Sequence, residues 1–334
     1  MPKKKRLIIG VDLGGTKIEA AIVRDGHILA SKKTKTQADQ GVDSVIDRIE
    51  KTVRAAMKKA DRTMAEMAAL CIGAPGAVDH HTGIVHDAPN LGWQDVLLGE
   101  ILQQRLGLPV LVDNDVNIGL VGEHVYGAGR GTLHMAGIFV GTGIGGGFIM
   151  DGKPYYGARG AAGEIGHIIV SPHGRRCRCG REGCVEAYAS KTAMEAMVRE
   201  QIDAGRHSIV LDLMRQKDKD GLTSSVVADA LAAQDAVMAE VVQTAQYYLG
   251  LLTANLVNAF DPEVVVFGGG LATRLGESFL EPIARTARQH YLQQQGAERI
   301  RIVPAFLGDH AGTIGAATVA KRRLQDTTTA LRHA

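Results

Sequence analysis

The amino-acid sequence predicts an α/β protein built from two similar domains with a cleft between them. Its length of 334 residues exceeds what one hydrophobic core usually serves and indicates about two domains. A strand–turn–strand unit near the N-terminus recurs in the middle of the chain. The 41 glycines gather where extended runs turn sharply, which is expected where backbone approaches a ligand.

The first half opens with a predicted β-meander. A β-branched run reaches Asp12, a Gly-Gly turn follows, and a second strand covers residues 18–23. The dipeptide Asp25-Gly26 then predicts a hairpin turn. Apolar residues at helical spacing predict a helix over residues 41–60.

Strands and helices alternate over the next stretch. The run AALCIGAPG, residues 68–76, predicts a buried strand that ends in a Gly/Pro turn. Residues 93–106 are predicted to form a helix, which Gly107 and Pro109 stop. The run PVLVDND, residues 109–115, predicts a strand that ends on acidic and amide groups, with a helix starting at Val116.

The segment HMAGIFVGTGIGGGFIMDGKPYYG, residues 134–157, repeats the opening meander. Both ends of the hairpin align at one offset: Gly15-Thr16 with Gly141-Thr142, and Asp25-Gly26 with Asp151-Gly152. An internal repeat of this kind predicts two similar domains that face each other.

The second half is predicted to be rich in helices. An amphipathic helix covers about residues 235–259, and Asp261-Pro262 stops it. The run EVVVFGGGLA, residues 263–272, predicts a buried strand that breaks into three glycines before a helix. Residues 309–324 predict a final helix.

Composition excludes several classes of protein. Hydrophobic residues make up 45% and charged residues 22%, as in soluble globular proteins. The apolar stretches are far shorter than the roughly 20 residues that cross a bilayer, so no membrane partner is expected. The basic run at residues 3–6 is interpreted as a solvated terminus rather than a nuclear address, and no signal-peptide core follows it. We therefore expect a cytoplasmic protein, and the net charge of +2 predicts no nucleic-acid partner.

Three glycine turns are candidates for phosphate binding. In the first, two glycines let backbone N–H groups approach an anion, beside a hydroxyl, an ammonium and a carboxylate that could hold Mg²⁺ through water. Its candidate residues are Asp12, Gly14, Gly15, Thr16 and Lys17. The other two turns offer Gly141, Thr142 and Gly143, and Gly268, Gly269 and Gly270. Each turn alone could equally be an ordinary turn without a ligand. The three together, in a chain with a repeated strand–turn–strand unit, predict a phosphate-binding cleft between two domains.

The run Asp113-Asn114-Asp115 allows two interpretations. Asp and Asn are favoured at helix N-caps, so the run is consistent with capping alone. A helix N-terminus also stabilises an ionised carboxylate, and a positioned Asp can accept the hydroxyl proton in phosphoryl transfer to an alcohol. The residues by themselves leave capping and catalysis open.

Three cysteines lie within eight residues, downstream of a histidine. His167, Cys177, Cys179 and Cys184 match the Cys₃His composition of a closed structural zinc site. The four arginines between residues 175 and 181 favour thiolates. Free thiols and a disulfide are the alternatives, and the C-x-x-C context of a redox pair is missing. If zinc is saturated by these ligands, the flanking Glu164 and Glu186 are free to accept hydrogen bonds from a polyol.

These motifs together resemble the ROK family of sugar kinases over nearly the whole chain, and within it most closely the bacterial glucokinases. The resemblance is carried by DLGGTK, GAPGAVD, PNLGW, NDVN…GE, VGTGIGGG, GEIGH, CRCGREGCVEAYAS and FGGGLA, in family order. It implies the actin-like, two-domain ATPase fold of the ribonuclease H-like class. The smaller N-terminal domain would comprise residues 1–117 with about 308–334. Residues 118–307 would form the larger domain, with a zinc-binding loop at 167–184.

The resemblance also implies roles for individual residues. Asp115 matches the base that deprotonates the sugar hydroxyl. His167 would bind zinc through one ring nitrogen and sugar through the other, and the three glycine turns match the nucleotide contacts. The residues that match sugar contacts are Gly76, Asn90, Asn114, Asp115, Glu164, His167 and Glu186. Family members often carry alanines after the Asn-Asp pair, whereas Val116 follows it here, which leaves the acidic group in place.

The activity that the resemblance implies is ATP-dependent phosphorylation of a hexose, first of all glucose to glucose 6-phosphate, with Mg²⁺. N-acetylhexosamines, fructose, mannose or allose as acceptor, and polyphosphate as donor, are alternatives. The family also includes sugar-sensing regulators, which carry a helix-turn-helix, but only eleven residues precede Asp12. The family further implies a homodimer or homotetramer.

Overall fold

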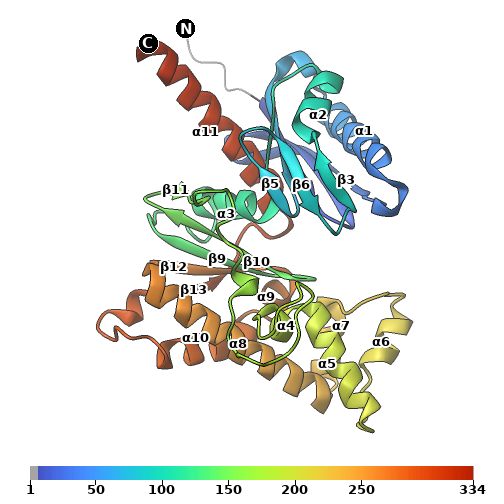
Figure 1. The fold of residues 1–334 in the computed structure, drawn as a ribbon. Helices are drawn as coiled ribbons and strands as arrows, with labels where there is room; N and C mark the ends of the chain where they lie inside the picture. The colour runs from blue at the N-terminus through green and yellow to red at the C-terminus, as the bar shows by residue number, and fades with distance from the viewer. Residues whose placement is uncertain (1–6, 334) are drawn as a thin grey trace. The chain divides into compact units, whose positions relative to one another are not determined.

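The computed structural model describes the backbone of residues 7–333 and the side chains of residues 7–325 (Figure 1). The basic run at residues 3–6 lies outside this range. The chain divides into two compact units. Unit 1 contains the residues up to Gly131, the short segment Tyr156–Ala162, and the residues from Asp309 onward. Unit 2 contains Thr132–Tyr155 and Gly163–Gly308.

The expected domain boundary after residue 117 would cut helix α3 (Asp115–Tyr126). Most of the buried residues of α3 lie beyond that point, and the helix packs against α11 (Ala311–His333), which belongs to unit 1. The compact unit therefore extends to Gly131 and keeps this helix whole.

Unit 1 has a mixed five-stranded sheet with the order β3-β2-β1-β4-β8. Its strands are β1 (Leu7–Leu13), β2 (Lys17–Arg24), β3 (His27–Lys35), β4 (Met67–Ala74) and β8 (Val110–Asn114). β1, β2 and β3 form the predicted antiparallel meander, whereas β1, β4 and β8 run parallel. The carboxyl ends of these three parallel strands therefore meet at one edge of the sheet.

Helices cover this sheet as the apolar periodicity predicts. α1 (Val42–Ala60) packs against β2 and β3 through a buried stripe that includes Val45, Ile49 and Val53. α11 packs on β1 and β4 as well as on α3. These contacts bury the faces of β1 and β4 and fix the strand ends that carry the candidate residues.

The helix predicted over residues 93–106 is wrong in its first part. Trp93–Val96 is strand β7, and helix α2 begins at Leu98 and ends at Leu106. β7 joins β5 (Ala77–Asp79) and β6 (Ile84–Ala88) in a small antiparallel sheet, where Trp93 pairs with Ala88 and is 1% exposed. Burial of the tryptophan in tertiary contacts thus overrides the local helical periodicity.

Unit 2 repeats the sheet of unit 1. Its order is β11-β10-β9-β12-β13, with an antiparallel hairpin followed by parallel strands. The strands are β9 (Met135–Val140), β10 (Ile144–Met150), β11 (Lys153–Pro154), β12 (Val264–Gly268) and β13 (Arg301–Pro304). The two hairpin turns also match, since Asp25-Gly26 and Asp151-Gly152 all have positive φ, as type I′ turns require. The predicted duplication is confirmed.

The helices of unit 2 surround one apolar core. They are α4 (Glu186–Ala189), α5 (Lys191–Asp203), α6 (Val210–Gln216), α7 (Ser224–Ala232), α8 (Ala236–Phe260), α9 (Gly270–Leu275) and α10 (Glu277–Gln289). The long helix α8 has close to the predicted extent and ends at Phe260. Its C-cap, Asp261, has a left-handed backbone and precedes Pro262.

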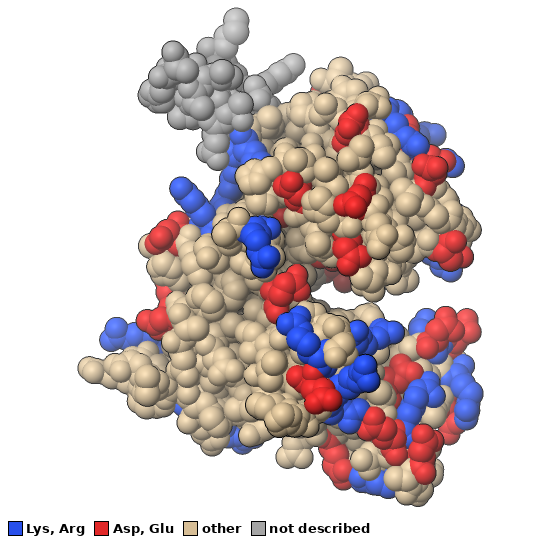
Figure 2. Space-filling model, in the orientation of Figure 1, with Lys and Arg blue, Asp and Glu red and all other residues tan. Residues whose placement is uncertain are grey.

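Two further features of the described residues bear on function. None of their helices combines the length and apolar character that a bilayer crossing requires. On the face shown in Figure 2, acidic and basic side chains occur together and neither forms a continuous surface. This distribution agrees with the small net charge of +2.

Candidate active site

In unit 1 the candidate residues follow the carboxyl ends of the parallel strands. Asp12 of β1 pairs with Gly73 of β4, and Gly73 pairs with Asp113 of β8, so the three lie on one line across the sheet. A Cβ at Gly73 would lie 2.1 Å from Cδ1 of Ile118 and 3.1 Å from Cα of Asp115. Only glycine at this position lets the first turn of α3 pack so closely on β4.

The first glycine turn lies beside Asn90. The Gly14 N–H donates to the Lys17 carbonyl at 2.9 Å, which closes the turn. A Cβ at Gly15 would lie 3.3 Å from Cβ of Asn90, so the backbone of the turn contacts this amide residue. Thr16 and Lys17 are exposed. A predicted phosphate turn and a predicted sugar residue are therefore neighbours within unit 1.

Asn114 links the other unit 1 candidates. Its Oδ1 accepts hydrogen bonds from the backbone N–H groups of Val116 and Asn117, at 2.9 and 3.2 Å, so Asn114 is the N-cap of α3. Its Nδ2 donates to the Gly76 carbonyl at 3.1 Å. Because Asn114 performs the capping, Asp115 is the first residue inside the helix, half-buried. The macrodipole there stabilises a carboxylate.

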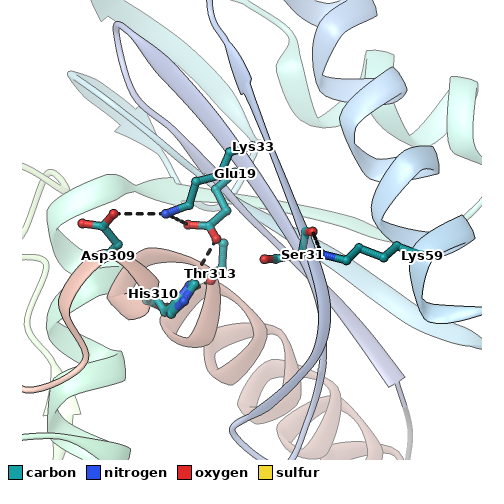
Figure 3. A network of polar contacts seen from close by, with 7 residues as sticks. All are labelled: Glu19, Ser31, Lys33, Lys59, Asp309, His310 and Thr313. Atoms are coloured by element: carbon teal, nitrogen blue, oxygen red, sulfur yellow. Dashed lines mark hydrogen bonds and ion pairs between the residues drawn. The ribbon is translucent and has the colours of Figure 1, made fainter.

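Glu19, Lys33, Asp309 and His310 form a network of charged groups (Figure 3), and the charges of Glu19, Lys33 and Asp309 act on Asp12. Lys33 Nζ lies 3.1 Å from a carboxylate oxygen of Asp309 and 3.5 Å from one of Glu19, and His310 Nδ1 lies 3.1 Å from Glu19. Glu19 is directly opposite Asp12 in the β1–β2 pair. Burial, followed by the charge of Glu19, raises the pKa of Asp12 to about 6.

In unit 2 the second glycine turn is held by side chains of α4 and α5. The Gly141 N–H donates to the Gly143 carbonyl at 2.9 Å, and the hydroxyl of Thr192 donates to the Thr142 carbonyl at 2.9 Å. Oε2 of Glu186 accepts from the Ile144 N–H at 2.8 Å. A Cβ at Gly143 would lie 2.5 Å from this oxygen. One carboxylate oxygen of Glu186 thus already holds the backbone of the turn.

The GEIGH segment forms a single 3-10 turn, η3 (Ile165–His167), which packs on β10. Glu164 precedes this turn and is exposed, whereas Ile165 is 3% exposed and anchors the segment in the core. The side chain of His167 is half-buried and points into the cysteine cluster, since its Nδ1 lies 3.8 Å from Sγ of Cys177. Its other ring nitrogen, Nε2, is the one left for a second partner.

The four candidate zinc ligands are brought together. One ligand atom from each of His167, Cys177, Cys179 and Cys184 lies within 4.8 Å of all the others. The Sγ atoms of Cys179 and Cys184 are 3.7 Å apart, far beyond the length of a disulfide bond. A tetrahedral zinc with Zn–S bonds of about 2.3 Å requires its sulfurs about 3.8 Å apart. The donor set and its spacing therefore fit zinc.

Two of the four nearby arginines have identifiable partners in this region. Arg181 forms a hydrogen bond with Cys179, as expected for a group that favours the thiolate. Arg175 instead makes two hydrogen bonds to the carboxylate of Glu200, at 2.8 and 2.5 Å. Arg175 therefore fastens the loop to α5 rather than acting on a thiol.

The third glycine turn follows β12 and starts α9. Close packing at all three positions, together with the positive φ of Gly269, accounts for the absence of side chains here. A Cβ at Gly268 would lie 2.2 Å from the Phe139 ring, one at Gly269 2.2 Å from the Val140 carbonyl oxygen, and one at Gly270 2.5 Å from Ser224 Oγ. These contacts place the turn beside the end of β9, the strand that leads into the second glycine turn.

Sequence reasoning missed two residues that contact the Asp113 carboxylate. The Tyr156 hydroxyl donates to Asp113 Oδ2 at 2.7 Å, and Arg323 Nη2 lies 3.6 Å from the same oxygen. Both come from segments far from Asp113 in the chain. No local spacing relates them, so only tertiary structure reveals the contact.

Comparison with known proteins identifies the family. The model of the ROK family matches residues 8–323. The glucokinase of Halalkalibacterium halodurans is 37% identical over 323 residues, which are 95% of this chain and 96% of the relative. The glucokinase of Thermotoga maritima is 35% identical, over 97% of this chain and 99% of the relative.

A solved structure agrees with these matches. The ROK family glucokinase from Streptomyces griseus, in complex with glucose and AMPPNP, superposes with a TM-score of 0.82 at 35% identity, over 95% of this chain and 99% of the other. This similarity confirms the predicted fold class, the actin-like ATPase fold. The chain belongs to the ROK family.

Proposed function

We propose that this protein is an ATP-dependent hexose kinase that converts glucose to glucose 6-phosphate. The observation that carries the proposal is similarity over nearly the full length to glucokinases, one of them solved with glucose and an ATP analogue. The candidate residues at the strand ends of unit 1 and in the cysteine loop of unit 2 support the same reaction.

Asp115 is the proposed base. Phosphoryl transfer to an alcohol needs a carboxylate that accepts the hydroxyl proton as the oxygen attacks the γ-phosphate in line. The position of Asp115 in the first turn of α3 favours its ionised form, because backbone N–H groups point toward it there. Asn114 caps the helix by accepting the N–H groups of Val116 and Asn117, and Oδ1 of Asp115 also accepts the Val116 N–H at 2.9 Å, which holds the carboxylate at the helix end.

Each unit contains residues proposed to contact sugar. Unit 1 offers Asn90 and Asn114, with the turn at Gly76 held by the Asn114 amide. Unit 2 offers Glu164, His167 and Glu186. The exposed Glu164 is available to accept hydrogen bonds from sugar hydroxyls. Nε2 of His167 would contact the sugar, since Nδ1 faces the thiols.

The glycine turns are the proposed nucleotide contacts. Backbone N–H groups of the turns at residues 12–17 and 141–143 would stabilise the charge of the transferred phosphoryl group. The turn at residues 268–270 would lie on the adenosine side. Asp12 would hold Mg²⁺ through water, and Lys17 adds a positive charge beside it.

The cysteine loop is proposed as a structural zinc site. His167, Cys177, Cys179 and Cys184 would hold the ion in a closed tetrahedral set, which leaves no position for catalysis at the metal. Bound zinc would stabilise the loop and fix the ring of His167 and the backbone that leads to Glu186. The protein residues, rather than the metal, would contact the sugar.

The remaining proposals concern organisation. The two compact units would be the two domains of the kinase, and Mg²⁺-ATP its phosphate donor. We also propose that the protein acts in the cytoplasm on a small-molecule sugar, without nucleic-acid or membrane partners. A homodimer or homotetramer is proposed on the family resemblance alone.

A phosphorylation screen tests the function. Purified protein would be assayed with glucose, mannose, fructose, allose, N-acetylglucosamine and N-acetylmannosamine, each with ATP and with polyphosphate. We expect the highest kcat/KM for glucose with ATP. A higher kcat/KM for an N-acetylhexosamine would identify the protein as an N-acetylhexosamine kinase instead of a glucokinase. Absence of phosphorylation with every sugar and donor pair would contradict the kinase proposal.

A further inference from the structure

We propose that Tyr156 and Arg323, acting through the buried carboxylate of Asp113, are positioning residues for the base Asp115. The proposal rests on the proposed function, because it concerns the geometry of that base. All four residues belong to unit 1.

Asp113 is a buried acid at the end of β8. It is 1% exposed, and an ionised carboxylate at such a position requires several partners. Oδ1 accepts the backbone N–H of Asn114 at 2.8 Å. Oδ2 accepts the hydroxyl of Tyr156 at 2.7 Å and lies 3.6 Å from the guanidinium of Arg323. Each oxygen therefore has a donor or a cation, and the side chain is held in one orientation.

The partners of Asp113 are themselves held. The Tyr156 ring stacks on His80, with ring centroids 4.0 Å apart and planes 21° apart. Nη1 of Arg323 donates to the His80 carbonyl at 2.6 Å. Burial and the Asp113 charge raise the pKa of Tyr156, so its hydroxyl remains a donor. Burial, with the charge of Arg323, lowers the pKa of His80 to about 4, so His80 is a neutral platform at physiological pH.

The contacts of Asp113 lead directly to the base. The backbone N–H that donates to Asp113 Oδ1 belongs to Asn114, which is the N-cap of α3. Asp115 is the next residue in the chain. Without the Tyr156 hydroxyl, Oδ2 of Asp113 would keep only the distant guanidinium of Arg323, and the carboxylate would turn to find another donor because an unpaired buried acceptor is unfavourable. That rotation would shift the backbone between β8 and α3. A shift of about 1 Å at a reacting group can lower the rate about 10²-fold.

A purely structural role predicts a different result. If Tyr156 only stabilised unit 1, Tyr156→Phe would lower the melting temperature but leave kcat of the folded enzyme unchanged. A positioning role predicts that kcat and kcat/KM fall together, because an interaction needed in the transition state is weakened.

The test uses the full-length enzyme with its metal. Tyr156→Phe keeps the ring and its stacking on His80 and removes only the hydroxyl, so the fold is preserved. We expect kcat with glucose and ATP to fall about tenfold, with the glucose KM changed less than about threefold. Tyr155→Phe is the matched control: Tyr155 is the neighbouring residue, 45% exposed, and its variant should retain the parental kcat.

A double-mutant cycle then tests the route through Asp113. In an Asp113→Asn background, Tyr156→Phe should change kcat less than about twofold, because the acceptor whose orientation it controls is already altered. An unchanged kcat for Tyr156→Phe in the parental enzyme would overturn the proposal, and so would a full tenfold loss in the Asp113→Asn background. Near-parental turnover of Asp115→Asn would instead overturn the proposed base itself, so the two failures are distinguishable.

Discussion

The two sheets share one strand order, yet the turns after their first strands carry different chemistry. The turn at residues 12–17 begins with a carboxylate and ends with an ammonium, next to the Glu19–Lys33 pair. The turn at residues 141–143 contains no ionisable side chain. Duplication therefore repeats the backbone that can approach a phosphate, whereas the ionisable groups of the first turn belong to unit 1 alone.

The strand ends differ in the same way. β8 of unit 1 ends with Asp113 and Asn114 and is followed directly by Asp115, whereas the corresponding β13 of unit 2 ends at Pro304 without an acid. Unit 2 carries instead a loop with four candidate metal ligands. The candidate proton acceptor and the charged glycine turn therefore lie in unit 1, and the candidate metal ligands and the uncharged glycine turns lie in unit 2.

Among the variants that probe this contrast between the units, the largest effect is expected at the candidate zinc ligands of unit 2. Metal analysis of the purified protein should find about one zinc per chain. Cys184→Ser should abolish most of it and raise the glucose KM at least about tenfold, because loss of a ligand frees the His167 ring. Cys71→Ser is the control, since Cys71 lies in β4 of unit 1 and should leave zinc content unchanged. A zinc-free preparation with full activity would contradict the structural role of the metal.

A second prediction uses the charge of the first turn. Because the pKa of Asp12 is raised from 3.8 to about 6 in the folded protein, its ionisation costs stability of up to about 3 kcal/mol. The stability that neutral Asp12 provides is complete below about pH 3.8 and is lost as the pH rises through about 6. Relative to the parental protein, Asp12→Asn should therefore gain free energy of unfolding between pH 4.5 and pH 8.

Denaturant unfolding in Mg²⁺-free buffer at several pH values measures this difference. Titrating groups far from Asp12 are common to both proteins and cancel in the comparison, so the difference reports Asp12 together with the charged neighbours that interact with it. If the extra free energy of unfolding of Asp12→Asn did not vary with pH, ionisation of Asp12 would not be its cause. The difference in charge between the two turns would then have no effect on stability.

The smallest effect is expected at the neutral turn. Gly143→Ala would bring a methyl group to 2.5 Å from Glu186 Oε2, so the carboxylate must move away from the Ile144 amide. A Cβ at Gly141 has only ordinary contacts, the nearest atom being the Gly143 carbonyl oxygen at 3.7 Å. Gly143→Ala should cost about 1–2 kcal/mol more in unfolding free energy than Gly141→Ala. Equal costs would mean that Glu186 does not brace the turn.

Local signals in the sequence predict the repeated parts of the fold. The two Asp-Gly turns and the long periodic helix α8 appear where pattern and turn chemistry place them. Residues 93–96 show the limit, because Trp93 is buried in a small sheet whose strands are too short to produce a clear period. Local periodicity cannot register such tertiary burial.

The candidate site likewise contains residues that local sequence predicts and residues that only the folded structure reveals. The cysteines are close in sequence, so their grouping was predictable, and the structure adds that Nδ1 of His167 faces Cys177. The sequence left open which residue of 113–115 caps α3, and the structure shows that it is Asn114. Tyr156 and Arg323 escaped prediction because their contact with Asp113 exists only after the chain has folded.

The most direct test of the central claim, transfer of a phosphoryl group from ATP to glucose with Asp115 as base, is the turnover of Asp115→Asn. Calorimetry of glucose binding, measured alongside, separates chemistry from binding. We predict that kcat falls at least ~10²-fold while the glucose dissociation constant stays within about threefold, because a general base contributes about 10²–10⁴ to the rate. Near-parental kcat in this variant would contradict the account.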